Sequence, residues 1–211
     1  SMVDVVGNHV APIGDDFNQI YPLNQSAHYH TDCDIVNWND QAQVEYCRLA
    51  DLPDLNQDNS YVRQYLKDWV QNLVKTFDFD GIRIDTIPEV SPDFWTEYGA
   101  ASGVFQMGEC FNGDPAYVGP YQNYVTGLFN YPMYYTISDV FGSQKSMKNI
   151  DSRYSAEGSH FKDIDALGLF VDNHDNARFL HNHGGKNTQL KAATVFSLTG
   201  RGIPFVYYGT E

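Results

Sequence analysis

Segments typical of β-strands alternate with segments typical of α-helices along this 211-residue chain. Six apolar or β-branched runs predict strands, at 2–9, 80–86, 104–110, 128–135, 166–175 and 203–211, and the run 128–135 is expected to continue into a helix. Apolar side chains at helical spacing predict a helix over 61–77, and residues 91–101 and 187–200 are also predicted to be helical. Because neighbouring parallel strands need long crossover connections, this order predicts an α/β fold with a parallel sheet.

A long polar stretch interrupts the alternation after the first strand. Residues 10–57 have almost no apolar periodicity and are rich in Asn, Asp, Gln and His. Loops of this length inside a domain are usually functional or form a small subdomain. We therefore divide the chain into a strand at 1–9, an excursion at 10–57 and the remaining α/β region at 58–211.

Two cysteines of this excursion, Cys33 and Cys47, enclose 13 residues. They are either bridged or two thiols of a protein in a reducing compartment. A disulfide is favoured, because the surrounding sequence is weakly hydrophobic and would gain about 3 kcal/mol from closing a loop of this size.

Carboxylates follow three of the predicted strands. Asp85, Glu109 and Asp175 stand at or just past the strand ends, and parallel strands bring those ends to one rim, where (β/α)₈ barrels build their active sites. A single aspartate there is most often a cap or turn residue. Three carboxylates on one rim repel one another unless they are protonated, paired with cations or used in chemistry, so together they indicate a site.

The sequence around these carboxylates suggests different roles for them. Arg83 shares a strand face with Asp85 two residues later, and its guanidinium would keep Asp85 ionised, as a nucleophile requires. The residues flanking Glu109 are less polar, which would favour the protonated form of a general acid. Such a pair, about 5 Å apart, is typical of a retaining glycosidase, with Asp175 as an auxiliary carboxylate.

Overall charge restricts the partners of the chain. A net charge of -14 argues against nucleic acid and against anionic membrane surfaces, since both would repel it. The sequence also lacks an apolar run of about 18 residues that could span a membrane. A neutral substrate is compatible with this charge.

Six short motifs, in order along the chain, resemble the conserved regions of the α-amylase family of glycoside hydrolases. Four resemble its signature regions: "DVVGNH" (4–9), "GIRIDTIPE" (81–89), "GECFNGD" (108–114) and "FVDNHD" (170–175). Two resemble its further short motifs: "LPDL" (52–55) and "GIPFVYYGTE" (202–211). The resemblance covers essentially the whole chain and is closest to fungal-type secreted α-amylases, which share the paired cysteines of the excursion.

The resemblance implies a fold and an activity. The fold is a partial (β/α)₈ TIM barrel holding strands three to eight, with 10–57 as a calcium-binding excursion (domain B) after strand three. The activity is retaining endo-hydrolysis of α-1,4-glucosidic bonds in starch, glycogen and maltooligosaccharides, by a secreted, extracellular enzyme that is a monomer when full length.

It also implies roles for individual residues. Asp85 matches the nucleophile that forms the covalent glycosyl intermediate, Glu109 matches the general acid/base, and Asp175 matches the carboxylate that holds sugar hydroxyls and stabilises the transition state. The polarity of "FVDNHD" would then arise because this strand end faces an oligosaccharide.

Three further residues match substrate-binding positions of the family. Arg83 matches the arginine beside the nucleophile. His9 and His174 match the histidine pair that binds hydroxyls of the sugar being cleaved. The alternative for both histidines is helix capping or hydrogen bonding in the core.

A structural Ca²⁺ is implied as cofactor. Asn8 and Asp54 match its side-chain ligands, and the main-chain oxygens of Glu45 and Glu89 match its carbonyl ligands. Hard oxygen donors suit Ca²⁺, and the ion would pin the weakly hydrophobic excursion to the rim. The alternative for Asp54 is a turn residue after Pro53.

Departures from the family pattern leave other functions open. Pro88-Glu89 stands where fungal members typically carry Lys-His, so an α-glucanotransferase or α-glucosidase is an alternative. A non-catalytic glucan-binding protein is another, although all three carboxylates are present. A divalent-metal hydrolase would need further histidine ligands, and the remaining candidates lie in polar loops: His28, His30, His181 and His183.

The extent of the resemblance predicts a fragment. The family's barrel has eight strands, and this chain matches the third to the eighth. Six strands cannot close a barrel, and open edges expose unpaired main-chain groups. We therefore expect the 211 residues in isolation to have little or no activity.

Overall fold

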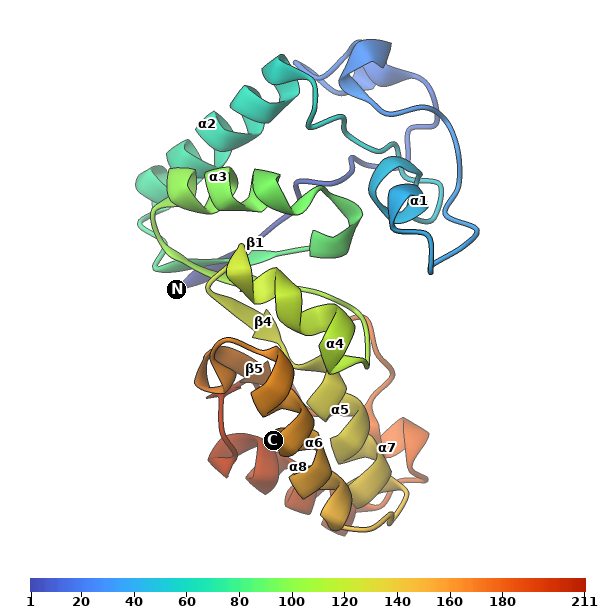
Figure 1. Cartoon of the computed structure of the whole chain (residues 1–211), viewed down its shortest axis with the longest axis vertical. Coiled ribbons are helices and arrows are strands. Elements are labelled where there is room, and N and C mark those ends of the chain that lie inside the picture. Colours follow the sequence, from blue (N-terminus) through green and yellow to red (C-terminus); the bar gives the residue numbers. More distant parts are fainter. The chain divides into compact units, whose positions relative to one another are not determined.

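The computed structural model describes all 211 residues and divides into two units, Ser1–Glu109 and Cys110–Glu211. In each unit three strands pair in parallel and in chain order, with helices in the connections between them (Figure 1). The predicted α/β class with parallel strands is confirmed. None of the helices is long and apolar enough to cross a membrane.

The first unit is built on strands β1 (Met2–Val5), β2 (Gly81–Ile84) and β3 (Phe105–Gly108). Every residue of β2 is buried, as expected for the central strand of a parallel sheet covered on both faces. The register pairs Ile84 with both Val5 and Gly108. The residues that follow these strands therefore emerge at the same edge.

Two helices, α2 (Ser60–Phe77) and α3 (Pro92–Ser102), pack against each other beside these strands (Figure 1). The buried side chains of α2 recur every fourth residue, namely Val62, Leu66, Val70 and Val74. The Asn59 side chain caps the start of α2 by accepting the N–H of Tyr61. Helix α3 adds three large, fully buried aromatic side chains, Phe94, Trp95 and Tyr98.

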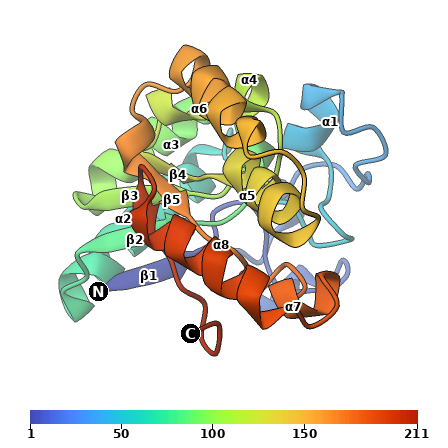
Figure 2. The same cartoon turned by 90° about the horizontal axis from the view of Figure 1, so that it is seen from below.

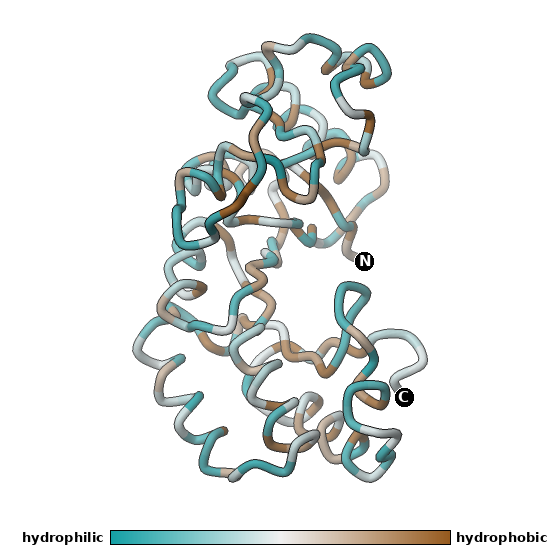
Figure 3. Tube along the Cα trace, turned by 90° about the vertical axis from the view of Figure 1, so that its right-hand side faces the viewer, coloured by the Kyte–Doolittle hydropathy of each residue, from teal (hydrophilic) through white to brown (hydrophobic).

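The excursion at 10–57 contains little regular structure, as predicted. It holds two single-turn 3₁₀ segments and one short helix: η1 (Phe17–Gln19), η2 (Ser26–His28) and α1 (Gln41–Tyr46). Isolated bridges join it to itself and to the residues after β1, including His9 to Asp54. Much of this segment is coloured teal and white in Figure 3, which agrees with its lack of a continuous apolar face.

The second unit repeats the strand and helix alternation with short strands, β4 (Gly127–Phe129), β5 (Leu167–Leu169) and β6 (Ile203–Pro204). Its α-helices are α4 (Pro115–Val118), α5 (Tyr131–Ile137), α6 (Lys148–His160), α7 (Phe179–Asn182) and α8 (Asn187–Thr199). Single-turn segments complete it: η4 (Gly119–Asn123), η6 (Ile164–Ala166) and the π-helix η5 (Ser138–Gly142). Figure 2 shows α5, α6 and α8 of this unit. Its core joins α5, β5, α7 and α8 through Met133, Ile137, Leu169, Val171, Phe179 and Ala193.

All six predicted strands are shorter in the structure, the last three most of all. The run 128–135 is a strand only up to Phe129 and continues as helix α5 from Tyr131. The run 166–175 forms a strand only at Leu167–Leu169, and 203–211 only at Ile203–Pro204. After β5, Asn173 accepts main-chain N–H groups of the following loop and Asp172 accepts that of Phe179 at the start of α7, which competes with sheet pairing. Helix α6 was not predicted, because it buries only Ile150 and Glu157 and therefore lacks an apolar period.

Candidate active site

The first unit brings two predicted carboxylates to one edge of its strands. Asp85 follows β2 and Glu109 follows β3, and their neighbours Ile84 and Gly108 are paired in the sheet. The main-chain N–H of Asp85 donates to Val5 at 3.0 Å, and that of Glu109 donates to Ile84 at 2.8 Å. Sheet pairing therefore fixes the backbone of both residues.

A single guanidinium, that of Arg83, contacts both carboxylates. Its Nη1 donates to Asp85 and, at 2.9 Å, to Asp4, while its Nη2 lies 3.1 Å from Oε2 of Glu109. Burial by itself would lower the pKa of Arg83, but the carboxylates of Glu109, Asp85 and Asp4 raise it above its usual range. The arginine therefore stays charged and holds Asp85 and Glu109 beside the same cation.

The surroundings of Glu109 differ from the weakly polar ones predicted. The side chain is buried, but Oε2 faces Arg83 and also accepts the main-chain N–H of Thr86 at 3.1 Å. Sequence neighbours gave the wrong environment because the groups that contact this carboxylate come from β2 and the residues after it.

His9 lies beyond β1, partly buried and near Asp85. Its Nδ1 is 2.8 Å from Oδ1 of Asn8, and since an amide oxygen only accepts, Nδ1 carries the hydrogen. Burial lowers the pKa of His9 against the opposing charge of Asp85. The ring is therefore neutral near pH 7.

The second unit carries Asp175 and His174 in the loop after β5. His174 Nε2 lies 3.1 Å from Oδ2 of Asp175, and both side chains are about half exposed. Asn173 shapes this loop: its Oδ1 accepts the N–H groups of Asp175 at 3.1 Å and Asn176 at 2.9 Å, and its Nδ2 donates to Tyr131 at 2.9 Å. Sequence analysis did not assign Asn173, although an Asn two residues before a turn residue is a typical Asx-turn signal.

Asp85 and Glu109 belong to the first unit, whereas Asp175 belongs to the second. The structure therefore brings Asp85, Glu109, Arg83 and His9 into one neighbourhood. That Asp175 and His174 converge on the same pocket stays a prediction.

Predicted calcium ligands from three segments meet in the first unit. The Asn8 amide nitrogen donates to Oδ1 of Asp54 at 2.5 Å and to the main-chain oxygen of Glu89 at 3.1 Å, and all three residues are buried. The fourth, Glu45, lies on α1, where Gln41 donates to its carboxylate and to the Pro88 carbonyl, each at 2.9 Å.

The oxygens of Asn8, Asp54 and Glu89 are of the kind that Ca²⁺ prefers. An ion among these residues would be bound by the Asn8 amide oxygen in place of its nitrogen. No cluster of three or more His, Cys, Asp or Glu groups able to hold a metal occurs in the chain. The predicted set is of another kind, because it combines one carboxylate with an amide and two main-chain carbonyls.

Two acidic side chains in this region are strongly perturbed. Burial raises the pKa of Asp54 to about 6, although hydrogen bonds from His30 and Asn8 act in the opposite direction. Burial, with the nearby charges of Glu109, Asp85 and Asp54, raises the pKa of Glu89 to about 8. The Oε2 atom of Glu89 is buried without a hydrogen-bond partner. Sequence analysis considered only the main-chain oxygen of Glu89, and nothing in the sequence indicated that its side chain is buried.

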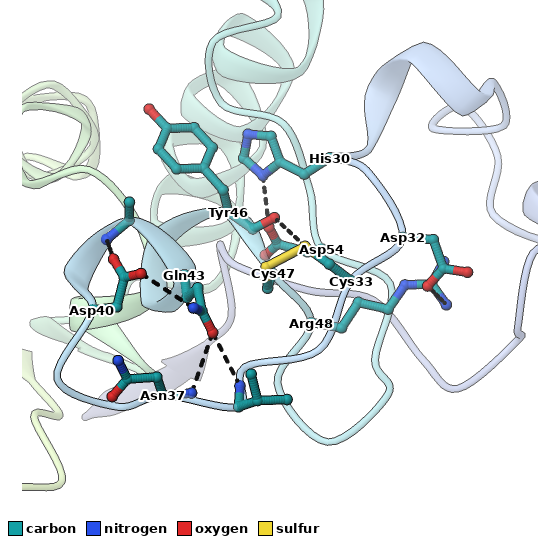
Figure 4. Close-up of a disulfide and its surroundings, with 12 residues drawn as sticks. His30, Asp32, Cys33, Asn37, Asp40, Gln43, Tyr46, Cys47, Arg48 and Asp54 are labelled. Atoms are coloured by element: carbon teal, nitrogen blue, oxygen red, sulfur yellow. Dashed lines mark hydrogen bonds and ion pairs between the residues drawn. A yellow bond between two sulfur atoms is a disulfide. The ribbon is translucent and has the colours of Figure 1, made fainter.

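Cys33 and Cys47 form a disulfide in the structure (Figure 4). The adjacent Arg48 is buried and forms ion pairs with three aspartates of the excursion, at 2.6 Å to Asp15, 3.1 Å to Asp32 and 3.6 Å to Asp51. Nearby, Nδ1 of His30 lies 2.6 Å from Oδ2 of Asp54, so this covalently closed region adjoins the predicted calcium ligands.

Comparison with known proteins finds relatives that are amylases. The family profile "Alpha amylase, catalytic domain" matches residues 2–211. The chain is 40% identical to alpha-amylase 2 of Schwanniomyces occidentalis over 219 residues, covering all of this chain and 43% of the relative. It is 42% identical to a beta/alpha-amylase of Paenibacillus polymyxa over 223 residues, covering all of this chain and 18% of that protein.

Solved structures agree with these sequence relatives. An alpha-amylase from Malbranchea cinnamomea superposes with a TM-score of 0.94 at 37% identity, covering all of this chain and 46% of the other. An alpha-amylase from Geobacillus thermoleovorans, in complex with acarbose, gives a TM-score of 0.91 at 30% identity, covering all of this chain and 49% of the other. The chain thus spans less than half the length of each of these proteins.

Proposed function

We propose, from the premise that this chain belongs to the alpha-amylase catalytic-domain family, that it carries the catalytic centre of a retaining α-glucan hydrolase. The substrate class is starch-type glucan, cleaved at internal α-1,4 bonds. The observation that carries the proposal is the pair Asp85 and Glu109 on one guanidinium, within a chain similar throughout to alpha-amylases.

In the first step, Asp85 attacks the anomeric carbon and forms a covalent bond while the glycosidic C–O bond breaks. Glu109 gives its proton to the departing sugar oxygen. In the second step, a water molecule attacks the anomeric carbon, Glu109 takes a proton from that water, and Asp85 is released. The sugar leaves with the configuration it had at the start.

The contacts around Asp85 suit a nucleophile, because Arg83 pairs with its carboxylate and holds it in place. Retaining enzymes hold their carboxyl groups about 5 Å apart, whereas inverting enzymes need roughly 6.5–9.5 Å to admit a water molecule. Attachment of both carboxylates to one guanidinium favours the shorter separation.

The remaining residues would bind rather than react. His9, neutral and close to Asp85, is suited to hydrogen bonding with a sugar hydroxyl, and we assign His174 and Asp175 to the same task from the second unit. A Ca²⁺ ion would be held by side-chain oxygens of Asn8 and Asp54 and main-chain oxygens of Glu45 and Glu89. Its contribution would be structural, since it would tie the excursion to the end of β1.

The disulfide and the similarity to yeast alpha-amylases support an extracellular location for the whole protein, which we expect to be a monomer. Transfer to another glucan is the second candidate function. Its basis is Pro88-Glu89, which stands where fungal members of the family typically carry Lys-His on the leaving-group side of the glucan.

Maltoheptaose digestion by the whole protein tests the proposal. We expect shorter products that first appear as the α-anomer by ¹H NMR, and a loss of several orders of magnitude in kcat for Asp85→Asn. The matched control is Asp151→Asn, an exposed aspartate on α6. Products longer than the substrate would indicate transfer. β-Anomers or an active Asp85→Asn variant would overturn the assignment.

A further inference from the structure

Thr86, directly after Asp85, has an unusual backbone conformation. Its φ of 46° and ψ of 54° place it in the left-handed region. A β-branched residue rarely adopts this conformation, because its side chain crowds the backbone. Strain of this kind persists only where the surroundings enforce it, and it gathers at functional sites.

The conformation of Thr86 directs two successive main-chain N–H groups at Glu109. The N–H of Thr86 donates to Oε2 of Glu109 at 3.1 Å, and the N–H of Ile87 donates to its main-chain oxygen at 3.0 Å. In an extended strand, successive N–H groups point to opposite edges. The left-handed turn is therefore what lets both groups reach the same residue.

Neighbouring contacts hold this turn in place. The indole Nε1 of Trp95, which is fully buried, donates to the main-chain oxygen of Ile87 at 2.8 Å. The N–H of Glu89 donates to the main-chain oxygen of Thr86 at 3.3 Å. The segment after β2 is thus held at Thr86 itself and at Ile87, the next residue.

The Oε2 oxygen of Glu109 therefore faces two donors at once. Oε2 lies 3.1 Å from Arg83 Nη2 and 3.1 Å from the N–H of Thr86, and both of these groups only donate. An oxygen that faces two donors has no acceptor there for a proton of its own. The proton of the neutral acid is therefore excluded from Oε2 and resides on Oε1.

We propose that Thr86 is a positioning residue whose main-chain N–H, together with Arg83, makes Oε1 of Glu109 the oxygen that protonates the leaving sugar. This role rests on the proposed function, in which Glu109 is the general acid. As the proton leaves Oε1, negative charge develops over the carboxylate, and the two donors on Oε2 stabilise it without rearrangement.

A main-chain ester at position 86 tests the role. Incorporating the α-hydroxy analogue of threonine replaces this one N–H by oxygen and keeps the side chain. We expect kcat/KM on maltoheptaose to fall roughly 10- to 100-fold, the range for a hydrogen bond to a charged group. On α-maltosyl fluoride we expect less than about a threefold change, because fluoride departs without a proton from Glu109.

Thr86→Gly is the matched control, since glycine adopts the left-handed conformation and keeps the N–H. Because Thr86→Gly also removes the contact of the Thr86 hydroxyl with Asn8 at 3.5 Å, we expect it to lose less activity on maltoheptaose than the ester protein. The exposed Asp151→Asn should stay within about threefold of the wild type on both substrates. Equal losses on both substrates, or no loss on maltoheptaose, for the ester protein would overturn the role of Thr86. A wild-type protein inactive on both would overturn the proposed function, and with it this role.

A spectroscopic measurement tests the contact even where the ester protein does not fold. In protein labelled with ¹⁵N-threonine, the Thr86 amide resonance should move in Glu109→Gln, because the charge-assisted acceptor is lost. The same resonance should stay in place in Asp151→Asn. An unchanged Thr86 resonance in Glu109→Gln would overturn the proposal.

Discussion

Glu157 on α6 is a buried carboxyl whose removal should stabilise the protein. The side chain is fully buried, and neither of its oxygens makes a well-formed hydrogen bond. Burial raises the pKa of Glu157 to about 7, although the Asn130 amide and the charges of Arg153 and Arg201 partly offset the effect. The folded protein therefore disfavours the charged form of this group.

The sign of the pH dependence follows from that shift. The unfolded chain ionises Glu157 near its ordinary value of 4.5, whereas the folded protein retains the proton up to about pH 7. Between these values the folded state binds more protons, so the free energy of unfolding falls as pH rises. A shift of this size corresponds to roughly 3 kcal/mol, reached above pH 7.

Glu157→Gln replaces the acid by a neutral side chain of nearly the same shape. We expect the variant and the wild type to have similar free energies of unfolding near pH 4.5, and the variant to be more stable by up to roughly 3 kcal/mol at pH 8. Urea unfolding of the whole protein from pH 4.5 to 8, followed by circular dichroism, measures the difference.

The control is Asp151→Asn, an exposed aspartate on the same helix, whose difference from the wild type should not grow over this range. A Glu157→Gln difference that is independent of pH would refute the reasoning. So would a variant less stable than the wild type at pH 8, because it would show that the folded protein accommodates the charged carboxylate.

Three further outcomes are expected. Replacing Cys33 and Cys47 by serine should lower the free energy of unfolding by about 3 kcal/mol, and a reducing agent should destabilise the wild type but not the variant. Gly142→Ala should cost about 1–3 kcal/mol, because a Cβ there would lie 2.2 Å from the His183 ring, and adding His183→Ala should restore much of this loss. Trp95→Phe leaves a buried carbonyl without its indole donor at 2.8 Å, so chemical denaturation should show a loss of about 1–3 kcal/mol.

The fold was predictable where local pattern and tertiary packing agree. Helix α2 (Ser60–Phe77) has a strict apolar period and a capping Asn59, so its sequence alone defines it. Helix α6 (Lys148–His160) has no such period, since one of its two buried side chains is Glu157. The strand that ends at Leu169 was predicted too long, because the apolar residues after it remain buried although the backbone has left the sheet.

The candidate site was predictable as a set of residues but not as a set of contacts. The positions of Asp85 and Glu109 follow from strand alternation, and the pairing of Arg83 with Asp85 follows from the period of two. The reach of the same guanidinium to Glu109 depends on β2 lying beside β3. The left-handed Thr86 was not foreseen, because threonine ordinarily avoids that conformation and only its surroundings enforce it.

Arg48, its three aspartate partners and one disulfide link distant parts of the excursion to one another. Because those aspartates are largely exposed, raised ionic strength weakens their pairing with Arg48, whereas packing of the neighbouring helices hardly responds to it. We therefore expect this segment to open in an equilibrium separate from global unfolding. Its amides should exchange with deuterium faster in high salt, while those of α2 (Ser60–Phe77) keep their protection, and a protease should cut there first.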